Sequence, residues 1–136
     1  MLIKDNLIID VDSNLKIPEN AIIYDLKGDY IYPSFIDLYS NYGLQKPNKK
    51  SSDFSPQYES KKNGPYSWNE AIHPEINASN EFSSVAKTAK AYLSNGFGAV
   101  LTHTQDGILR GTAAFVSLSE KIDNKNLLIK DSCYLF

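Results

Sequence analysis

The sequence is poor in the residues that build disulfides, metal centres and anion-binding patches. Its 136 residues include one cysteine, Cys133, which excludes an internal disulfide framework and a zinc site made of several cysteines. It has two histidines, His73 and His103, so a centre of three or four histidines cannot be built from this chain alone. Of its 14 basic residues only Arg110 is arginine, the side chain best suited to bind an anion through two parallel hydrogen bonds.

The chain also lacks a basic excess and a long apolar run. Its formal net charge is −2, whereas binding to nucleic-acid phosphates usually needs a surplus of basic residues. No apolar run approaches the roughly 20 residues of a membrane-spanning helix, and the first residues lack the apolar stretch of a signal peptide. We therefore expect no nucleic acid partner, no membrane span and, by default, the cytoplasm, with export of a longer protein left open. The sequence does not indicate an oligomeric state.

What the chain does have is the composition of a globular domain, with 42% hydrophobic residues. Apolar and β-branched residues predict short strands near the start of the chain, at 7–11, 21–26, 30–32 and 34–39. Residues 43–77 hold four of the six prolines and predict a long loop. A loop of this length is usually either functional or disordered.

A helix is predicted after this loop, because apolar residues recur at helical spacing from Phe82 to Leu93. Ser79 or Asn80 is expected to cap its start, and Gly96 follows its end. Further strands are expected at 99–102, 112–118 and 127–129. A helix between strands is typical of a βαβ unit with parallel strands, so the predicted class is α/β.

One part of the chain resembles a known protein family. Residues 32–41 (YPSFIDLYSN), preceded by IPENA at 17–21 and Lys27-Gly28, resemble the N-terminal signature of the amidohydrolase superfamily. These are metal-dependent hydrolases such as imidazolonepropionase and dihydroorotase. The family pattern is a β-sandwich segment, a glycine turn and then Pro-Gly-Phe-Ile-Asp-x-His-x-His on the first barrel strand. A weaker likeness extends from residue 70 to residue 118, where Gly96 begins the segment that corresponds to the family's second strand.

The resemblance implies a fold and a chemistry. The fold is a TIM-type (β/α)8 barrel with a composite β-sandwich built from both chain ends, and the chemistry is hydrolysis of C–N bonds, as in cyclic amides, by metal-activated water. Residues 1–33 would then belong to the sandwich and residues 34–136 would begin the barrel. Because a full barrel needs about 200 residues or more, we expect it to be incomplete here. The rest of the barrel would come from a missing C-terminal part, and this chain alone should be inactive.

The chain departs from the family pattern at the metal ligands. Residues i and i+2 of a strand share a face, so the two family histidines reach one ion. Tyr39 and Asn41 stand at these positions here, and a neutral tyrosine hydroxyl and an asparagine amide are poor zinc ligands beside imidazole. We expect no cofactor in this chain, while a zinc-type divalent metal in the longer protein stays open. Asp37 is expected to bind backbone near the end of its strand.

His103, Asp106 and Arg110 form the candidate pocket. His103 ends a predicted strand, and barrel enzymes place their active sites at such strand ends. His103 would act as a base or ligand, Asp106 as its orienting partner and Arg110 as an anion clamp for a small-molecule substrate. The alternative is structural: Asp106-Gly107 is a turn, His103 caps it and Arg110 pairs with a nearby carboxylate.

The remaining features are expected to be structural. His73 is predicted in a loop because Pro74 disfavours helix before it, and Cys133 is predicted as a small core residue. Two alternatives to the amidohydrolase interpretation remain. The chain is a non-catalytic binding or scaffold protein on a degenerate amidohydrolase fold, or a free-standing small α/β domain whose likeness to the family is accidental.

Overall fold

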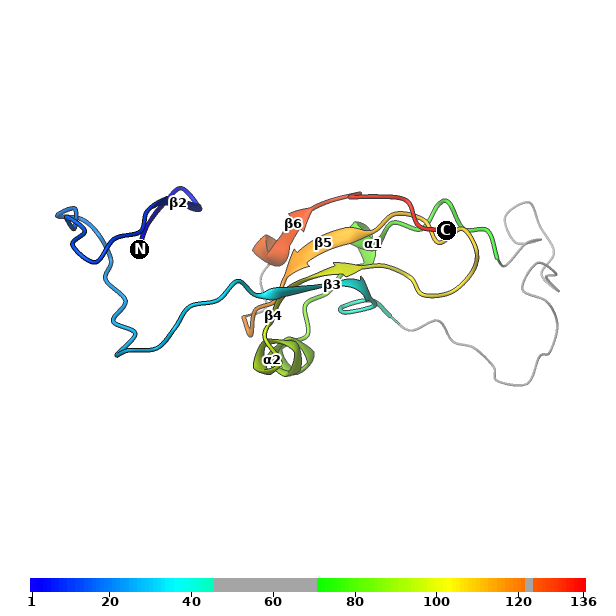
Figure 1. Cartoon of the computed structure of the whole chain (residues 1–136). Helices are drawn as coiled ribbons and strands as arrows, with labels where there is room; N and C mark the ends of the chain where they lie inside the picture. Colours follow the sequence, from blue (N-terminus) through cyan, green and yellow to red (C-terminus); the bar gives the residue numbers. More distant parts are fainter. Residues whose placement is uncertain (46–70, 122–123) are drawn as a thin grey trace. The chain divides into compact units, whose positions relative to one another are not determined.

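The computed structural model describes residues 1–45, 71–121 and 124–136 (Figure 1). The chain divides into two units, Met1–Tyr32 and Pro33–Phe136. That the first is a sandwich segment and the second the start of a barrel stays a prediction. Most of the loop predicted at 43–77 lies outside the described residues.

The first unit contains one antiparallel hairpin, formed by β1 (Leu2–Lys4) and β2 (Leu7–Asp10). Asp5 and Asn6 in the turn both have positive φ, which a two-residue type I′ turn requires. The prediction of strands at 21–26 and 30–32 was wrong, because these residues are not in strands. A β-branched sequence forms a strand only where a partner accepts its backbone hydrogen bonds, and none of the described strands pairs with them.

The second unit is built on a mixed four-stranded sheet in the order β3-β4-β5-β6. Its strands are β3 (Phe35–Ser40), β4 (Phe97–Thr102), β5 (Ala114–Ser117) and β6 (Leu127–Ile129). The predicted parallel pairing is confirmed for β3 and β4, whereas β5 and β6 each pair antiparallel. The mixed α/β class is therefore confirmed. The described strands form an open sheet rather than a closed barrel.

The single helix predicted between a cap at Ser79 or Asn80 and Gly96 is divided in two. The helices are α1 (Ala78–Glu81) and α2 (Ala86–Ser94), and a short 3-10 turn, Asn124–Asn126, precedes β6. Asn77, rather than Ser79 or Asn80, caps α1. Residues 82–85 leave the helix because their backbone has tertiary partners. The Ser83 N–H donates to the Gly43 carbonyl and the Val85 N–H donates to the Tyr42 hydroxyl.

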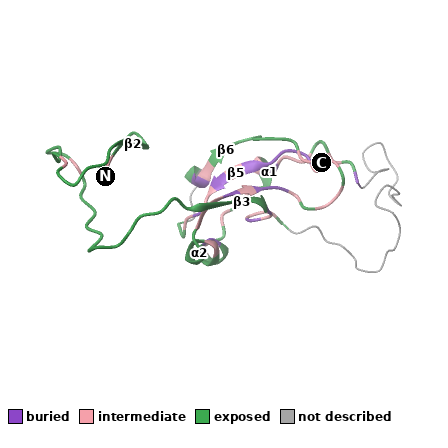
Figure 2. Ribbon diagram, in the orientation of Figure 1, coloured by how far each residue is buried: buried purple, intermediate pink, exposed green. Residues whose placement is uncertain are grey.

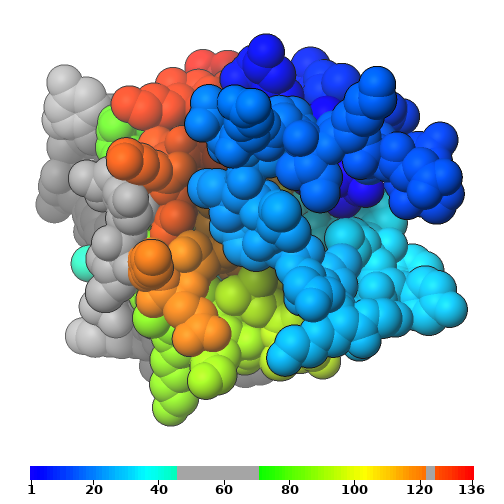
Figure 3. Space-filling view, turned by 90° about the vertical axis from the view of Figure 1, so that its left-hand side faces the viewer, coloured from blue at the N-terminus to red at the C-terminus, as the bar shows by residue number. Residues whose placement is uncertain are grey.

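The core lies where α2 packs on the sheet (Figure 2). Its buried apolar residues are Tyr42, Ala78, Ala89, Val100, Ala114, Val116 and Leu118. The strand β3 is less covered than β4 and β5, since its Phe35, Ile36 and Leu38 are exposed. Figure 3 shows the cyan residues of β3 at the surface. None of the described helices is both long and apolar enough to cross a membrane.

The prediction that Cys133 is a core residue was wrong, because its side chain is exposed. The segment around it is held by its backbone instead. The Ala113 N–H donates to the Cys133 carbonyl, and the Leu135 N–H donates to the Gly111 carbonyl. These bonds place the last residues beside residues 110–113.

Candidate functional site

The candidate site lies where β3 and β4 end. Because the two strands are parallel, their carboxyl ends meet at the same edge of the sheet. Tyr39 is near the end of β3, and His103 follows β4 directly. The His103 N–H donates to the Ser40 carbonyl at 2.9 Å, which fixes the two strand ends against each other.

The His103 side chain is fully buried and has one hydrogen bond. Its Nδ1 lies 2.9 Å from the Thr104 carbonyl oxygen. Since a carbonyl only accepts, Nδ1 must carry the proton, and in the neutral ring Nε2 is left as an acceptor. Within the part of the chain that the structure describes, this Nε2 has no partner. Buried polar atoms are rarely left unpaired, so this lone pair is the most conspicuous chemical feature of the second unit.

Arg110 reaches the same place from the loop that follows β4. Its Nη1 donates to the Tyr39 hydroxyl at 3.1 Å, and its Nε donates to the Gly107 carbonyl at 3.0 Å. Its guanidinium carbon lies 5.7 Å from the centroid of the Tyr39 ring, and that ring packs edge-on against His103 with centroids 4.9 Å apart. The Tyr39 carbonyl accepts from the Gln105 amide. Tyr39 is thus the residue on which His103, Gln105 and Arg110 converge.

The two aspartates of the region hold backbone. Asp106 accepts from the Gly107 N–H at 3.0 Å, while the His103 ring is oriented by the Thr104 carbonyl. Asp37 accepts from the Tyr39 N–H at 2.9 Å, the backbone role expected for it. The structural alternative predicts a carboxylate partner for Arg110, and no carboxylate of the described residues pairs with it.

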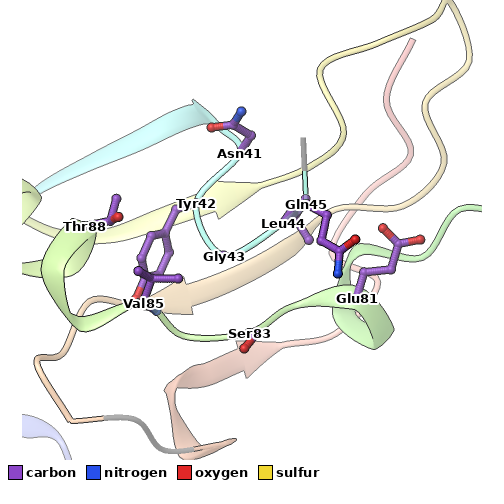
Figure 4. A pocket seen from close by; sticks show the side chains of 9 residues that line it. All are labelled: Asn41, Tyr42, Gly43, Leu44, Gln45, Glu81, Ser83, Val85 and Thr88. Carbon is purple, nitrogen blue, oxygen red and sulfur yellow. The ribbon is translucent and has the colours of Figure 1, made fainter. Parts of the chain in front are cut away.

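Asn41 belongs to a different part of the surface. It lies in the turn after β3 and lines a cavity of about 430 Å³, to which α1, α2 and residues 42–45 also contribute (Figure 4). Glu81, Ser83 and Thr88 supply the other polar side chains of this cavity, together with Gln45. Sequence reasoning missed them, because nothing in the local pattern relates α1 and α2 to the turn after β3.

Comparison with known proteins gives a likeness in structure alone. No family model matches the chain, and no curated protein matches it. Its fold resembles that of an amidohydrolase. The solved protein, an amidohydrolase from Thermotoga maritima MSB8, matches with a TM-score of 0.56 and 21% sequence identity. The match covers 90% of this chain and 29% of the amidohydrolase, so the chain spans less than a third of that protein.

The described residues do not fit the metal that the amidohydrolase resemblance implies. The Tyr39 hydroxyl accepts a hydrogen bond from a guanidinium, and a fixed positive charge at this distance opposes a divalent cation on the same oxygen. Asn41 lines the cavity beside α1 and α2 instead. No group of three or more His, Cys, Asp or Glu residues is placed to hold a metal ion in the described ranges.

Proposed function

We propose that the chain is the N-terminal part of an amidohydrolase-like protein that hydrolyses C–N bonds of the cyclic amide class. The observation that supports this is the likeness of nearly the whole chain to less than a third of an amidohydrolase. In this proposal residues 1–33 contribute to a β-sandwich, and residues 34–136 supply the first βαβ unit of a barrel. The chain alone is then inactive, because the reacting groups of the later strands are absent.

In this proposal the chain contributes structure rather than metal ligands. Arg110, Gln105 and His103 hold Tyr39 at the strand edge, where the family pattern has its first metal-binding histidine. We expect any divalent metal of the longer protein to be bound by residues outside this chain. A small-molecule substrate would meet Arg110 and His103 at the same edge.

The contact between Tyr39 and Arg110 favours a second candidate, a non-catalytic binding protein on a degenerate amidohydrolase fold. A guanidinium beside the first ligand position provides an anion-binding group, and anion binding requires no hydrolysis. The two candidates differ in metal content and in turnover, so one set of measurements distinguishes them.

The test compares this chain with a longer protein that begins with it. Both are assayed for ring opening of hydantoin and dihydrouracil, and their zinc, iron and manganese contents are measured by elemental analysis. We expect turnover and metal only in the longer protein, with the metal retained after Asn41→Ala. A longer protein without turnover or metal would favour the binding protein. Stoichiometric metal that is lost on substitution of Tyr39 or Asn41 would contradict our assignment of the ligands.

A further inference from the structure

We propose that the end of β3 and β4 binds a small 2-hydroxycarboxylate, with the carboxylate on Arg110 and the hydroxyl on His103. This site requires no hydrolytic activity, so it stands whether or not the longer protein is an amidohydrolase. Within the described residues, it is carried by a buried acceptor without a donor and by a guanidinium with unused donors, on two side chains that both contact Tyr39.

The first group is the buried acceptor of His103. Its tautomer is set by the Thr104 carbonyl, which leaves Nε2 without a donor among the described residues. A buried acceptor with no partner carries the full cost of its lost hydration. A ligand that brings an N–H or O–H to this atom recovers that cost on binding.

The second group is the free part of the Arg110 guanidinium. Of its five N–H bonds, two donate to described residues, one from Nε to Gly107 and one from Nη1 to Tyr39. No carboxylate pairs with Arg110 within the described ranges. The residue is half-buried, so its charge is only partly screened by water. A planar fork with free donors is the geometry that binds a carboxylate through two parallel hydrogen bonds.

The shared contact with the Tyr39 ring limits the ligand to a small molecule. The centroid of the Tyr39 ring lies 4.9 Å from that of His103 and 5.7 Å from the guanidinium carbon of Arg110. A molecule that replaces the Tyr39 ring can therefore meet both groups at once. Tyr39 is 57% exposed, whereas His103 is buried and Arg110 is half-buried, so in this proposal the Tyr39 ring moves aside when the ligand enters.

The two groups together select the ligand class. Arg110 requires a negative charge, and His103 requires a donor close to that charge. An ammonium donor would sit unfavourably beside the guanidinium, whereas a hydroxyl donates without adding charge. A carboxylate with a hydroxyl on the neighbouring carbon satisfies both requirements.

The experiment uses the 136-residue chain and three probes of similar size. Glycolate carries both the carboxylate and the hydroxyl, acetate lacks the hydroxyl, and glycolamide lacks the charge. Binding is followed by NMR through the side-chain 15N shifts of His103, with His73 as the internal reference. We expect glycolate to bind about tenfold more tightly than acetate, and glycolamide not to bind.

Three variants separate the two groups. Arg110→Gln should weaken glycolate and acetate alike by about tenfold or more. His103→Phe keeps a ring in the same packing, and it should abolish the preference for glycolate while leaving acetate binding unchanged. Lys90→Gln removes an exposed positive charge on α2 and should change neither affinity. For the variants, binding is read from backbone amide shifts, which also show whether each one folds.

Three results would contradict the proposal. Equal affinity of the unmodified chain for glycolate and acetate would remove the role of His103. Unchanged binding in Arg110→Gln would show that any attraction of anions is non-specific. Tyr39→Ala, which deletes the ring that rests on His103, should tighten glycolate binding, and weaker binding in this variant would contradict entry of the ligand past Tyr39.

Discussion

At the scale of single residues, the hydrogen bond between His73 and Glu75 lowers the pKa of a carboxyl group. The Glu75 pKa lies below its ordinary value of 4.5, mainly because the His73 ring nitrogen is 2.8 Å from a carboxylate oxygen. We expect His73→Ala to raise this pKa towards 4.5 in a carboxyl 13C NMR titration. The pKa of Asp12, which is lowered by the Asn14 N–H and the Ser13 hydroxyl, should not move.

The sign of the stability effect follows from the direction of that shift. Because the folded state lowers the Glu75 pKa, the pair stabilises the fold above the ordinary glutamate pKa, and this contribution is lost as pH falls through the lowered value. It should be small, since Glu75 is largely exposed. An unchanged Glu75 pKa in His73→Ala would show that the histidine is not its cause.

The residues of the candidate site could be named from sequence, but their contacts could not. His103 and Arg110 stand out because they are rare residue types after a predicted strand. Their meeting at Tyr39 depends on the parallel pairing of β3 with β4 and on the path of residues 103–110, which bring Arg110 to a residue 71 positions earlier. That the Nε2 of His103 is unpaired among the described residues could not be predicted either, because the tautomer is fixed by the backbone carbonyl of Thr104.

At the scale of elements, the strands of the sheet were predictable where a partner strand exists. The sequences of β3 and residues 21–26 are similarly apolar, yet only β3 is paired. The division between α1 and α2 was not visible in the periodic pattern. It arises because the Tyr42 hydroxyl and the Gly43 carbonyl compete for the backbone N–H groups of residues 83–85, and such tertiary competition leaves no local signal.

One close approach between elements depends on a glycine. Gly111 has φ +81°, and a Cβ there would overlap the carbonyl oxygen of Ile76, which accepts from the Thr112 N–H. Gly96 has a similar φ of +85° but only ordinary contact with Phe35, at 3.5 Å or more. We expect Gly96→Ala to cost about 1–2 kcal/mol of unfolding free energy, and Gly111→Ala to cost a further 1–3 kcal/mol or so.

Urea unfolding of the two variants, followed by circular dichroism, measures this difference. Both substitutions introduce the same kind of backbone strain at a positive φ. The difference between their free energies of unfolding therefore reports the overlap with Ile76. Equal midpoints for Gly111→Ala and Gly96→Ala would show that residues 76 and 111 separate readily. That result would argue against a rigid attachment of residues 71–77 to the loop that carries Arg110.

The packing of α2 on the sheet makes a second prediction at this scale. Val100 on β4 is fully buried in the core, whereas Val85, just before α2, is 45% exposed. Val100→Ala should lower the free energy of unfolding by about 2 kcal/mol, through lost burial and the cavity left behind. Val85→Ala should change it by about 0.5 kcal/mol or less, and equal losses in urea unfolding would contradict the position of the core.

At the scale of the whole molecule, burial is concentrated in one of the two units. Every fully buried described residue lies in Pro33–Phe136, and none lies in Met1–Tyr32. The first unit nevertheless holds many exposed apolar side chains, among them Ile22, Ile23 and Tyr30. Soluble proteins rarely leave contiguous apolar surface uncovered, and a two-stranded hairpin is marginally stable by itself. The stability of the chain must therefore reside in the second unit.

This uneven burial predicts how a shortened chain behaves. A chain of residues 33–136 should unfold with the same urea midpoint as the full chain, because it retains all the fully buried residues of the described structure. It should also self-associate less, because it lacks the exposed apolar side chains of residues 1–32. Sedimentation velocity over a range of concentrations measures the association, and a variant with Ile22 and Ile23 changed to serine in the full chain is the matched control.

A lower midpoint in the shortened chain would show that residues 1–32 stabilise the sheet. Equal association of all three proteins would instead assign the association to the exposed residues of β3, Phe35, Ile36 and Leu38.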